Sequence, residues 1–271
     1  MRLYKYVDEH IVDVLRDFRL KVTRISDLND PFDCFPACFT GSSEEEIRRR
    51  FLSEEGWREM VQRNPELVGQ FGGFDKFKTL MLGNRERVLS MAKDVAFLND
   101  VFMKNINKTR QNAYVLSLSE VADDVLMWAH YARQNSGAVV ELGIGDGPSL
   151  EGYLLKKVDY DDARPLVNPN ALDSEVQKQF DKVFMTKSLQ WAHEREWRLL
   201  SSKEIFEGGD SLYYLKINPS TIQGVVLGCA VSETLRDEVM ALLQQSRLKH
   251  VTLKQATLHE KEYKVEIIDV T

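Results

Sequence analysis

Alternating apolar and polar positions predict most of the strands in this chain. RLYKYV at residues 2–7 and RLKVTRIS at residues 19–26 repeat with the period of two that a half-buried strand shows. Further stretches of strand character lie at 113–120, 137–145, 152–160, 195–202, 211–218, 222–231, 251–258 and 263–270. Since these strands do not alternate regularly with helices, the pattern predicts an α+β protein with a mixed or antiparallel sheet.

Helical periodicity is concentrated in one long stretch, residues 42–108. A capping box, Ser43 followed by Glu46, opens it, and EEEIRRR places acids four residues before bases. We expect this stretch to be a helical insertion or cap within a single domain that spans residues 1–271. Shorter helices are expected at 9–18, 123–134, 174–187 and 233–245.

Composition indicates an ordinary globular protein. The chain has 271 residues, a hydrophobic fraction of 43% and a net charge of −6. No apolar run approaches the roughly 20 residues of a membrane helix, and the N-terminus lacks the apolar core of a secretion signal. We therefore expect a cytoplasmic protein with no membrane partner. The charge disfavours a general nucleic-acid coat protein but permits an enzyme that meets nucleic acid through a local basic surface.

Familiar motifs for metal, nucleotide or hydrolytic chemistry are absent from the sequence. It contains no GxGxxG, GxxxxGK[ST], HExxH or GxSxG pattern. The cysteines Cys34, Cys38 and Cys229 lack a matching Cys/His pair, so we expect small buried thiols and no metal site.

Three polar and aromatic clusters remain: LYKY with NDPFD, SLS with MWAHYA, and EREWR. On a strand, Glu194, Glu196 and Arg198 would share one face, while Trp197 and Leu199 would pack into the core. Two interpretations of EREWR stay open. It is either an Arg198–Glu196 ion pair that closes a polar strand end, or an active-site strand with Glu196 exposed at its mouth.

These motifs resemble those of a widespread bacterial family of unknown function, marked by YKY, NDPFD, MWxHY and ExEWR. More loosely, the chain resembles the ADP-ribosyltransferase superfamily. There, an early strand grips NAD, a middle strand opens with Ser or Tyr near the nicotinamide ribose, and a late strand begins with a glutamate. This second resemblance implies a split sheet, NAD as substrate, and an intracellular toxin or defence effector, with a neutralising antitoxin as a possible partner.

The resemblance also implies roles for individual residues. Glu196 would stabilise the positive charge that develops on the ribose, and Glu194 would orient or deprotonate the acceptor, a nucleic acid or a protein. Tyr6 or Lys5 of the first strand would hold the cofactor. An aromatic ring would stack on nicotinamide, and Arg198 or Lys5 would meet the pyrophosphate. The expected NAD-contacting residues are Tyr4, Lys5, Tyr6, Ser117, Ser119, Trp128, Tyr131 and Arg198.

Other interpretations of the same residues remain open. Trp128 and Tyr131 also fit the core of an amphipathic helix, and His130 fits a satisfied, partly buried histidine. If these residues have only such structural roles, the chain is a non-catalytic binding module that holds a nucleotide or partner. A metal-independent nuclease that uses His130 with Glu196 is a third possibility.

Overall fold

The computed structural model describes residues 1–37, 39–145, 147–209 and 212–270. The chain divides into two compact units. The first comprises Met1–Leu28, Gln111–Tyr160 and Leu189–Thr271, and the second comprises Asn29–Arg110 and Asp161–Ser188. Because the chain crosses several times between them, neither unit is a single continuous segment.

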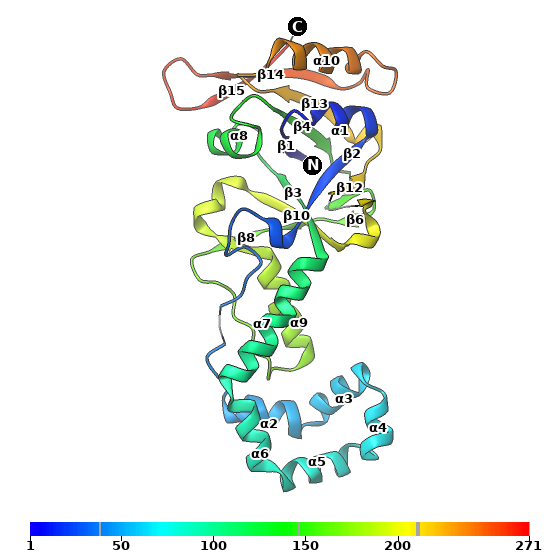
Figure 1. The fold of residues 1–271 in the computed structure, drawn as a ribbon, viewed down its shortest axis with the longest axis vertical. Coiled ribbons are helices and arrows are strands. Elements are labelled where there is room, and N and C mark those ends of the chain that lie inside the picture. Colours follow the sequence, from blue (N-terminus) through cyan, green and yellow to red (C-terminus); the bar gives the residue numbers. More distant parts are fainter. Residues whose placement is uncertain (38, 146, 210–211, 271) are drawn as a thin grey trace. The chain divides into compact units, whose positions relative to one another are not determined.

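A large sheet forms the first unit (Figure 1). Within the described residues it has eleven strands, and every pairing is antiparallel except that of β13 with β14. The strand order is β11-β12-β2-β3-β1-β4-β13-β14-β15, and β10 pairs with both β3 and β7. This confirms the predicted α+β class. The strands are β1 (Arg2–Val7), β2 (Arg19–Arg24), β3 (Ala113–Ser119), β4 (Ala138–Gly143), β7 (Lys156–Lys157), β10 (Glu196–Ser202), β11 (Glu207–Gly209), β12 (Leu212–Lys216), β13 (Ile222–Leu227), β14 (Thr252–Leu258) and β15 (Val265–Asp269).

The sheet forks at β3. One edge of β3 pairs with β10 along its whole length. Its other edge is shared, because Tyr114 and Val115 pair with β2 while Ser119 pairs with β1. The two neighbours of that edge therefore diverge near Ser117, in the middle of β3.

Helices cover both faces of this sheet. On one face, α1 (Ile11–Asp17) and α10 (Glu233–Leu243) join the larger apolar core, which includes Leu3, Leu116 and Val140 from the strands. On the other face, α8 (Val125–Tyr131) packs Met127 and Trp128 against strand residues such as Val139. The unit also contains the short strands β5 (Ser149–Leu150) and β6 (Tyr153–Leu154), and the 3-10 helices η1 (Ile25–Asp27), η2 (Leu189–Glu194), η3 (Lys203–Ile205) and η4 (Pro219–Thr221).

The second unit is mainly helical. The stretch expected to be helical forms six consecutive helices, and the capping box of Ser43 and Glu46 is present. This unit also includes residues 29–41 and α9, whose Val183 packs in a small core with Phe102 and Ile106 of α7. Its helices are α2 (Glu44–Leu52), α3 (Glu54–Arg63), α4 (Glu66–Phe71), α5 (Phe74–Gly83), α6 (Arg85–Lys93), α7 (Val95–Asn112) and α9 (Asp173–Met185); the short strands β8 (Asp159–Asp161) and β9 (Thr186–Ser188) adjoin its later part.

Some local expectations differ from the structure. Helix α8 ends at Tyr131, before the expected end at residue 134, and residues 133–135 adopt left-handed backbone angles. Gly137 allows a close approach of two backbone segments, since a Cβ there would lie 2.3 Å from the carbonyl oxygen of Val7. Cys34 is buried as expected, but Cys229 is exposed, and Cys38 lies outside the described residues.

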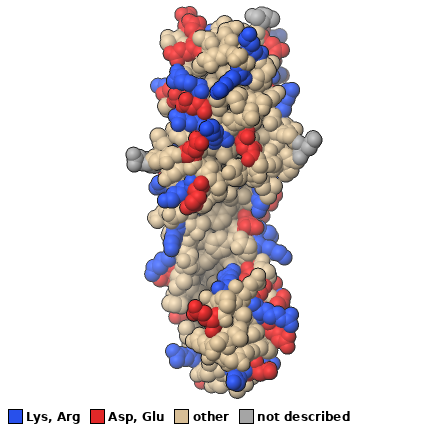
Figure 2. Space-filling model, turned by 90° about the vertical axis from the view of Figure 1, so that its right-hand side faces the viewer, with Lys and Arg blue, Asp and Glu red and all other residues tan. Residues whose placement is uncertain are grey.

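The surface is mixed in charge. On the face shown in Figure 2, acidic and basic side chains are interspersed instead of being grouped by sign. Among the described helices, none is both long and apolar enough to cross a membrane.

Candidate functional site

Three strands that are far apart in sequence bring candidate residues into one row. Tyr4 of β1 pairs with Ser119 of β3, and Ser119 pairs in turn with Glu196 of β10. Glu141 of β4 extends the row on the other side of Tyr4. Paired residues of antiparallel strands project to the same face, so these four side chains share one face of the sheet. Tyr4 packs against the core that includes α8, which places the row on the α8 face.

The EREWR segment changes conformation at its centre. Strand β10 begins at Glu196, whereas Glu194 ends the 3-10 helix η2. Between them, Arg195 has a φ of 44°, so strand alternation does not extend back to Glu194. From Glu196 onward the predicted alternation holds: Leu199 is buried in the opposite core, and Trp197 packs against it.

Glu196 and Arg198 form a buried bidentate ion pair. Arg198 donates from Nε to Glu196 Oε1 and from Nη2 to Oε2, both at 2.8 Å. The two residues are only 4% and 1% exposed, so the expectation of an exposed carboxylate at the strand mouth is wrong. β10 is an interior strand at this point, with β3 on one edge and Lys156 and Lys157 of β7 on the other. The pairing favours the ionised form of the carboxylate and fixes its orientation.

Glu194 is also buried, in a separate set of hydrogen bonds. Its Oε1 accepts from the hydroxyl of Tyr131 at 2.7 Å, which ties η2 to the end of α8. Ser119 Oγ donates to the backbone oxygen of Glu194 at 2.6 Å and accepts from Val121 N–H at 3.0 Å. Ser119 and Tyr131 thus hold the residue before the EREWR strand in place.

Lys5 occupies the fork of the sheet. Its Nζ donates to the backbone oxygen of Ser117 at 3.1 Å, between the points where β2 and β1 leave β3. Burial lowers the pKa of the Lys5 ammonium to about 8, and the negative charge of Glu196 acts in the opposite direction. Lys5 therefore binds a backbone carbonyl of β3 at the edge where β1 and β2 diverge, and the charge of Glu196 acts on its ammonium group.

Tyr6 and Trp128 are core residues in this structure. Their rings meet edge to face with centroids 5.6 Å apart, and Trp128 is 1% exposed. Trp128 Nε1 donates to Ala122 O at 2.7 Å, and the Tyr6 hydroxyl donates to Val121 O at 3.2 Å. Burial raises the pKa of the Tyr6 hydroxyl well above its usual value. Both rings are covered by protein, which leaves Tyr4 and Tyr131 as the partly exposed aromatic candidates.

His130 is exposed, so the expectation of a partly buried histidine is wrong. Its ring lies edge to face with Trp191 of η2, with centroids 6.1 Å apart. Trp191 in turn stacks with His193 at 6.2 Å. The contacts of these three rings connect α8 with η2.

The structure adds residues that the sequence patterns did not single out. Tyr160 accepts a hydrogen bond at its hydroxyl from Glu196 N–H at 2.8 Å, and burial raises its pKa. Arg195 turns outward at its unusual backbone angle and borders a cavity of about 410 Å³. The cavity is lined by Val121, Asp123, Asp124, Val125, Leu126, His193, Arg195, Tyr263 and Lys264. The sequence prediction of a strand through Arg195 assumes extended backbone angles at every residue. It therefore does not indicate that Arg195 borders a cavity.

Comparison with known protein families, with curated proteins and with solved structures finds no significant match to this chain.

Proposed function

We propose that this protein is an NAD-dependent ADP-ribosyltransferase that acts as a toxin or defence effector on a nucleic-acid or protein acceptor. The observation that carries the proposal is the row of Tyr4, Ser119 and Glu196 across β1, β3 and β10. In the superfamily that the sequence motifs resemble, an early, a middle and a late strand contribute to one site. Here β1, β3 and β10 are neighbours in a sheet that forks at β3, and this arrangement supports the proposal.

The chemistry assigns a role to the charge of Glu196. Cleavage of the bond between ribose and nicotinamide develops positive charge on the ribose, and a carboxylate near the ribose hydroxyls stabilises it. Arg198 keeps that carboxylate ionised and oriented, a positioning role that replaces the pyrophosphate contact expected from sequence. Its guanidinium is already committed to Glu196 at 2.8 Å. Glu194, one residue before the strand, would orient or deprotonate the acceptor.

Access to both carboxylates requires movement of the residues that cover them, because Glu194 and Glu196 are only 3% and 4% exposed. We assign this movement to the segment Leu189–Glu194, which carries Glu194. Loop displacement on substrate binding is common in enzymes that exclude water from the reaction. The cavity beside His193 and Arg195 lies next to this segment and suits an acceptor group.

A second function, a non-catalytic module that binds a nucleotide or partner, is favoured by the burial of the ion pair. A bidentate pair with both members under 5% exposed is also what a purely structural strand end would contain. In that case the protein binds NAD, or another ligand, without cleaving it. The nuclease alternative has less support, because the exposed His130 packs beside Trp191 whereas Glu196 pairs with Arg198.

Transfer of label from adenylate-labelled NAD tests the proposal. The protein is incubated with a cell extract, and the labelled products are treated with nuclease or protease to identify the acceptor class. We expect incorporation that falls in Glu194→Gln but persists in Glu120→Gln. Glu120 is the matched control, because its carboxylate binds Trp197 Nε1 and Lys157 outside the row of the site. Binding of NAD without incorporation would favour the non-catalytic module, and RNA cleavage in EDTA without NAD would favour the nuclease.

A further inference from the structure

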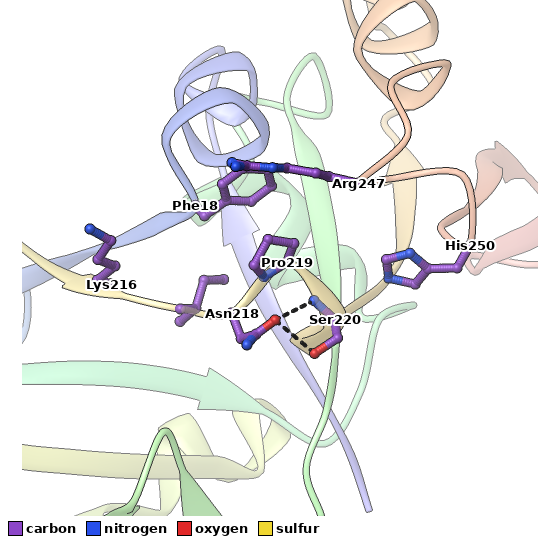
Figure 3. A pocket seen from close by; sticks show the side chains of 8 residues that line it. Phe18, Lys216, Asn218, Pro219, Ser220, Arg247 and His250 are labelled. Carbon is purple, nitrogen blue, oxygen red and sulfur yellow. Dashed lines mark hydrogen bonds between the residues drawn. The ribbon is translucent and has the colours of Figure 1, made fainter.

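A second cavity, of about 530 Å³, lies elsewhere in the first unit (Figure 3). The residue that ends α1, the turn after β12 and the loop between α10 and β14 all contribute to it. Its lining residues are Phe18, Lys216, Ile217, Asn218, Pro219, Ser220, Arg247 and His250. None of them belongs to the row of Tyr4, Ser119 and Glu196, so the inference drawn from this cavity does not depend on the proposed transferase activity.

The charge of this cavity has one sign. Lys216 and Arg247 carry positive charge, and none of the described lining residues is acidic. The nearby Glu207 lies 3.8 Å from Lys216 Nζ, but both side chains are more than 60% exposed, so water screens the pair. Glu151 is engaged at the turn, where its Oε1 accepts from Asn218 N–H at 2.8 Å. Although the chain has a net charge of −6, the charged side chains that line this cavity, Lys216 and Arg247, are both positive.

The cavity also contains a flat, cationic platform. Phe18 ends α1 with a φ of 53° and is 8% exposed, so its ring is held within the core. The guanidinium of Arg247 lies 5.7 Å from the centre of that ring, and Figure 3 shows the side chain extended across it. Cation–π attraction favours this contact. Arg247 itself is exposed, which leaves its guanidinium accessible to a ligand.

Polar groups on the opposite side are held by the turn. Asn218 Oδ1 accepts from the backbone N–H of Ser220 at 3.0 Å and from its hydroxyl at 2.8 Å. His250 donates from Nε2 to Ile222 O at 2.9 Å, which directs its Nδ1 edge away from that carbonyl. The ligand site therefore has fixed polar groups opposite the Phe18–Arg247 platform.

We propose that this cavity binds a nucleotide segment of single-stranded nucleic acid. Lys216 and Arg247 would contact the phosphate, and the base would stack on the guanidinium plane of Arg247. Single-stranded nucleic acid is recognised by this combination of backbone cations with aromatic rings or arginine planes. An acidic peptide would satisfy the cations but would make no use of the platform, which is why a nucleotide is the ligand favoured here.

Fluorescence anisotropy with labelled single-stranded RNA and DNA of about ten nucleotides tests the proposal. We expect Lys216→Gln/Arg247→Gln to bind at least about tenfold more weakly. The slope of log K against log salt concentration should also become shallower by about 1.4, because two phosphate contacts are lost. The matched control, Lys203→Gln/Lys261→Gln, removes the same charge from exposed positions of the first unit and should stay within about twofold of the wild type. All the substituted residues are exposed, so melting temperatures should be unchanged and report correct folding.

Further binding experiments identify the class of ligand. Arg247→Lys keeps the charge but loses the planar stacking surface, and it should weaken binding of the oligonucleotide more than it weakens binding of inorganic phosphate. If AMP competes at a concentration similar to that of the unlabelled oligonucleotide, the site holds one nucleotide. If only longer oligonucleotides compete, the site holds several nucleotides of a strand. The proposal is overturned if the wild type does not bind, if the control variant loses as much affinity, or if polyglutamate competes as well as the oligonucleotide.

Discussion

Replacing Glu196 by Gln should strongly destabilise the first unit. The amide keeps the size of the side chain but removes the charge that receives two hydrogen bonds of 2.8 Å from Arg198. Both residues are under 5% exposed, so water cannot screen the guanidinium once its carboxylate is lost. Breaking a buried pair by removing one partner typically costs about 3–5 kcal/mol. For a chain of this size that corresponds to a fall of roughly 6–20 °C in melting temperature.

Urea unfolding followed by tryptophan fluorescence measures this loss. A Trp57→Phe background restricts the signal to the first unit, because Trp57 lies in the second unit and the other tryptophans all lie in the first. Glu207→Gln serves as the control, since its carboxylate is 64% exposed and 3.8 Å from Lys216, and it should change the unfolding free energy by less than about 1 kcal/mol.

Two further results would decide the outcome. Glu196→Gln/Arg198→Met should recover part of the loss, because the double variant leaves no charge buried at this position. A loss below about 1 kcal/mol in Glu196→Gln alone would refute the reasoning, since it would show that the pair is hydrated in solution.

Further predictions concern three other positions. The pKa of Lys5 is about 8 in the folded protein and 10.5 for an unperturbed lysine, so the unfolded chain binds more protons between these values. The free energy of unfolding of the wild type, measured in urea and taken relative to Lys5→Met, should therefore rise by at most about 3 kcal/mol from about pH 7.5 to 10.5. A difference that does not change with pH would contradict this. Tyr131→Phe removes the hydrogen bond to Glu194 and should cost about 1.5–3 kcal/mol in urea unfolding; an unchanged value would show that the bond contributes nothing. Gly137→Ala places a Cβ 2.3 Å from Val7 O and should lower the melting temperature by several degrees, and tolerance would disprove the close approach.

Much of the fold was predictable from local patterns. The alternation of RLYKYV and AYVLSLSE predicted β1 and β3, because one or both faces of these strands are buried and side-chain burial repeats every two residues. The capping box of Ser43 and Glu46 marked the start of α2 correctly. Both signals act within a few residues, which is the range that a sequence pattern records.

The candidate site was less predictable, because it depends on contacts between distant strands. The pattern of EREWR was correct from Glu196 onward but not at Arg195, whose positive φ is rare for a residue with a Cβ. Glu196 lies on an interior strand between β3 and β7, and its backbone N–H donates to the hydroxyl of Tyr160. No local pattern contains those neighbours, and a carboxylate at the end of a strand is usually exposed.

Release of nicotinamide from NAD is the measurement that tests the central claim most directly. Wild type, Glu196→Gln and Glu120→Gln are compared at a temperature where urea and thermal unfolding show that all three are folded. Loss of a charge interaction made in the transition state costs about 3–4 kcal/mol, so Glu196→Gln should release nicotinamide some hundred- to thousand-fold more slowly, whereas Glu120→Gln should match the wild type. If folded Glu196→Gln releases nicotinamide at the wild-type rate, or if the wild type releases none with cell extract supplied as a source of acceptors, the EREWR strand is structural and the transferase proposal is wrong.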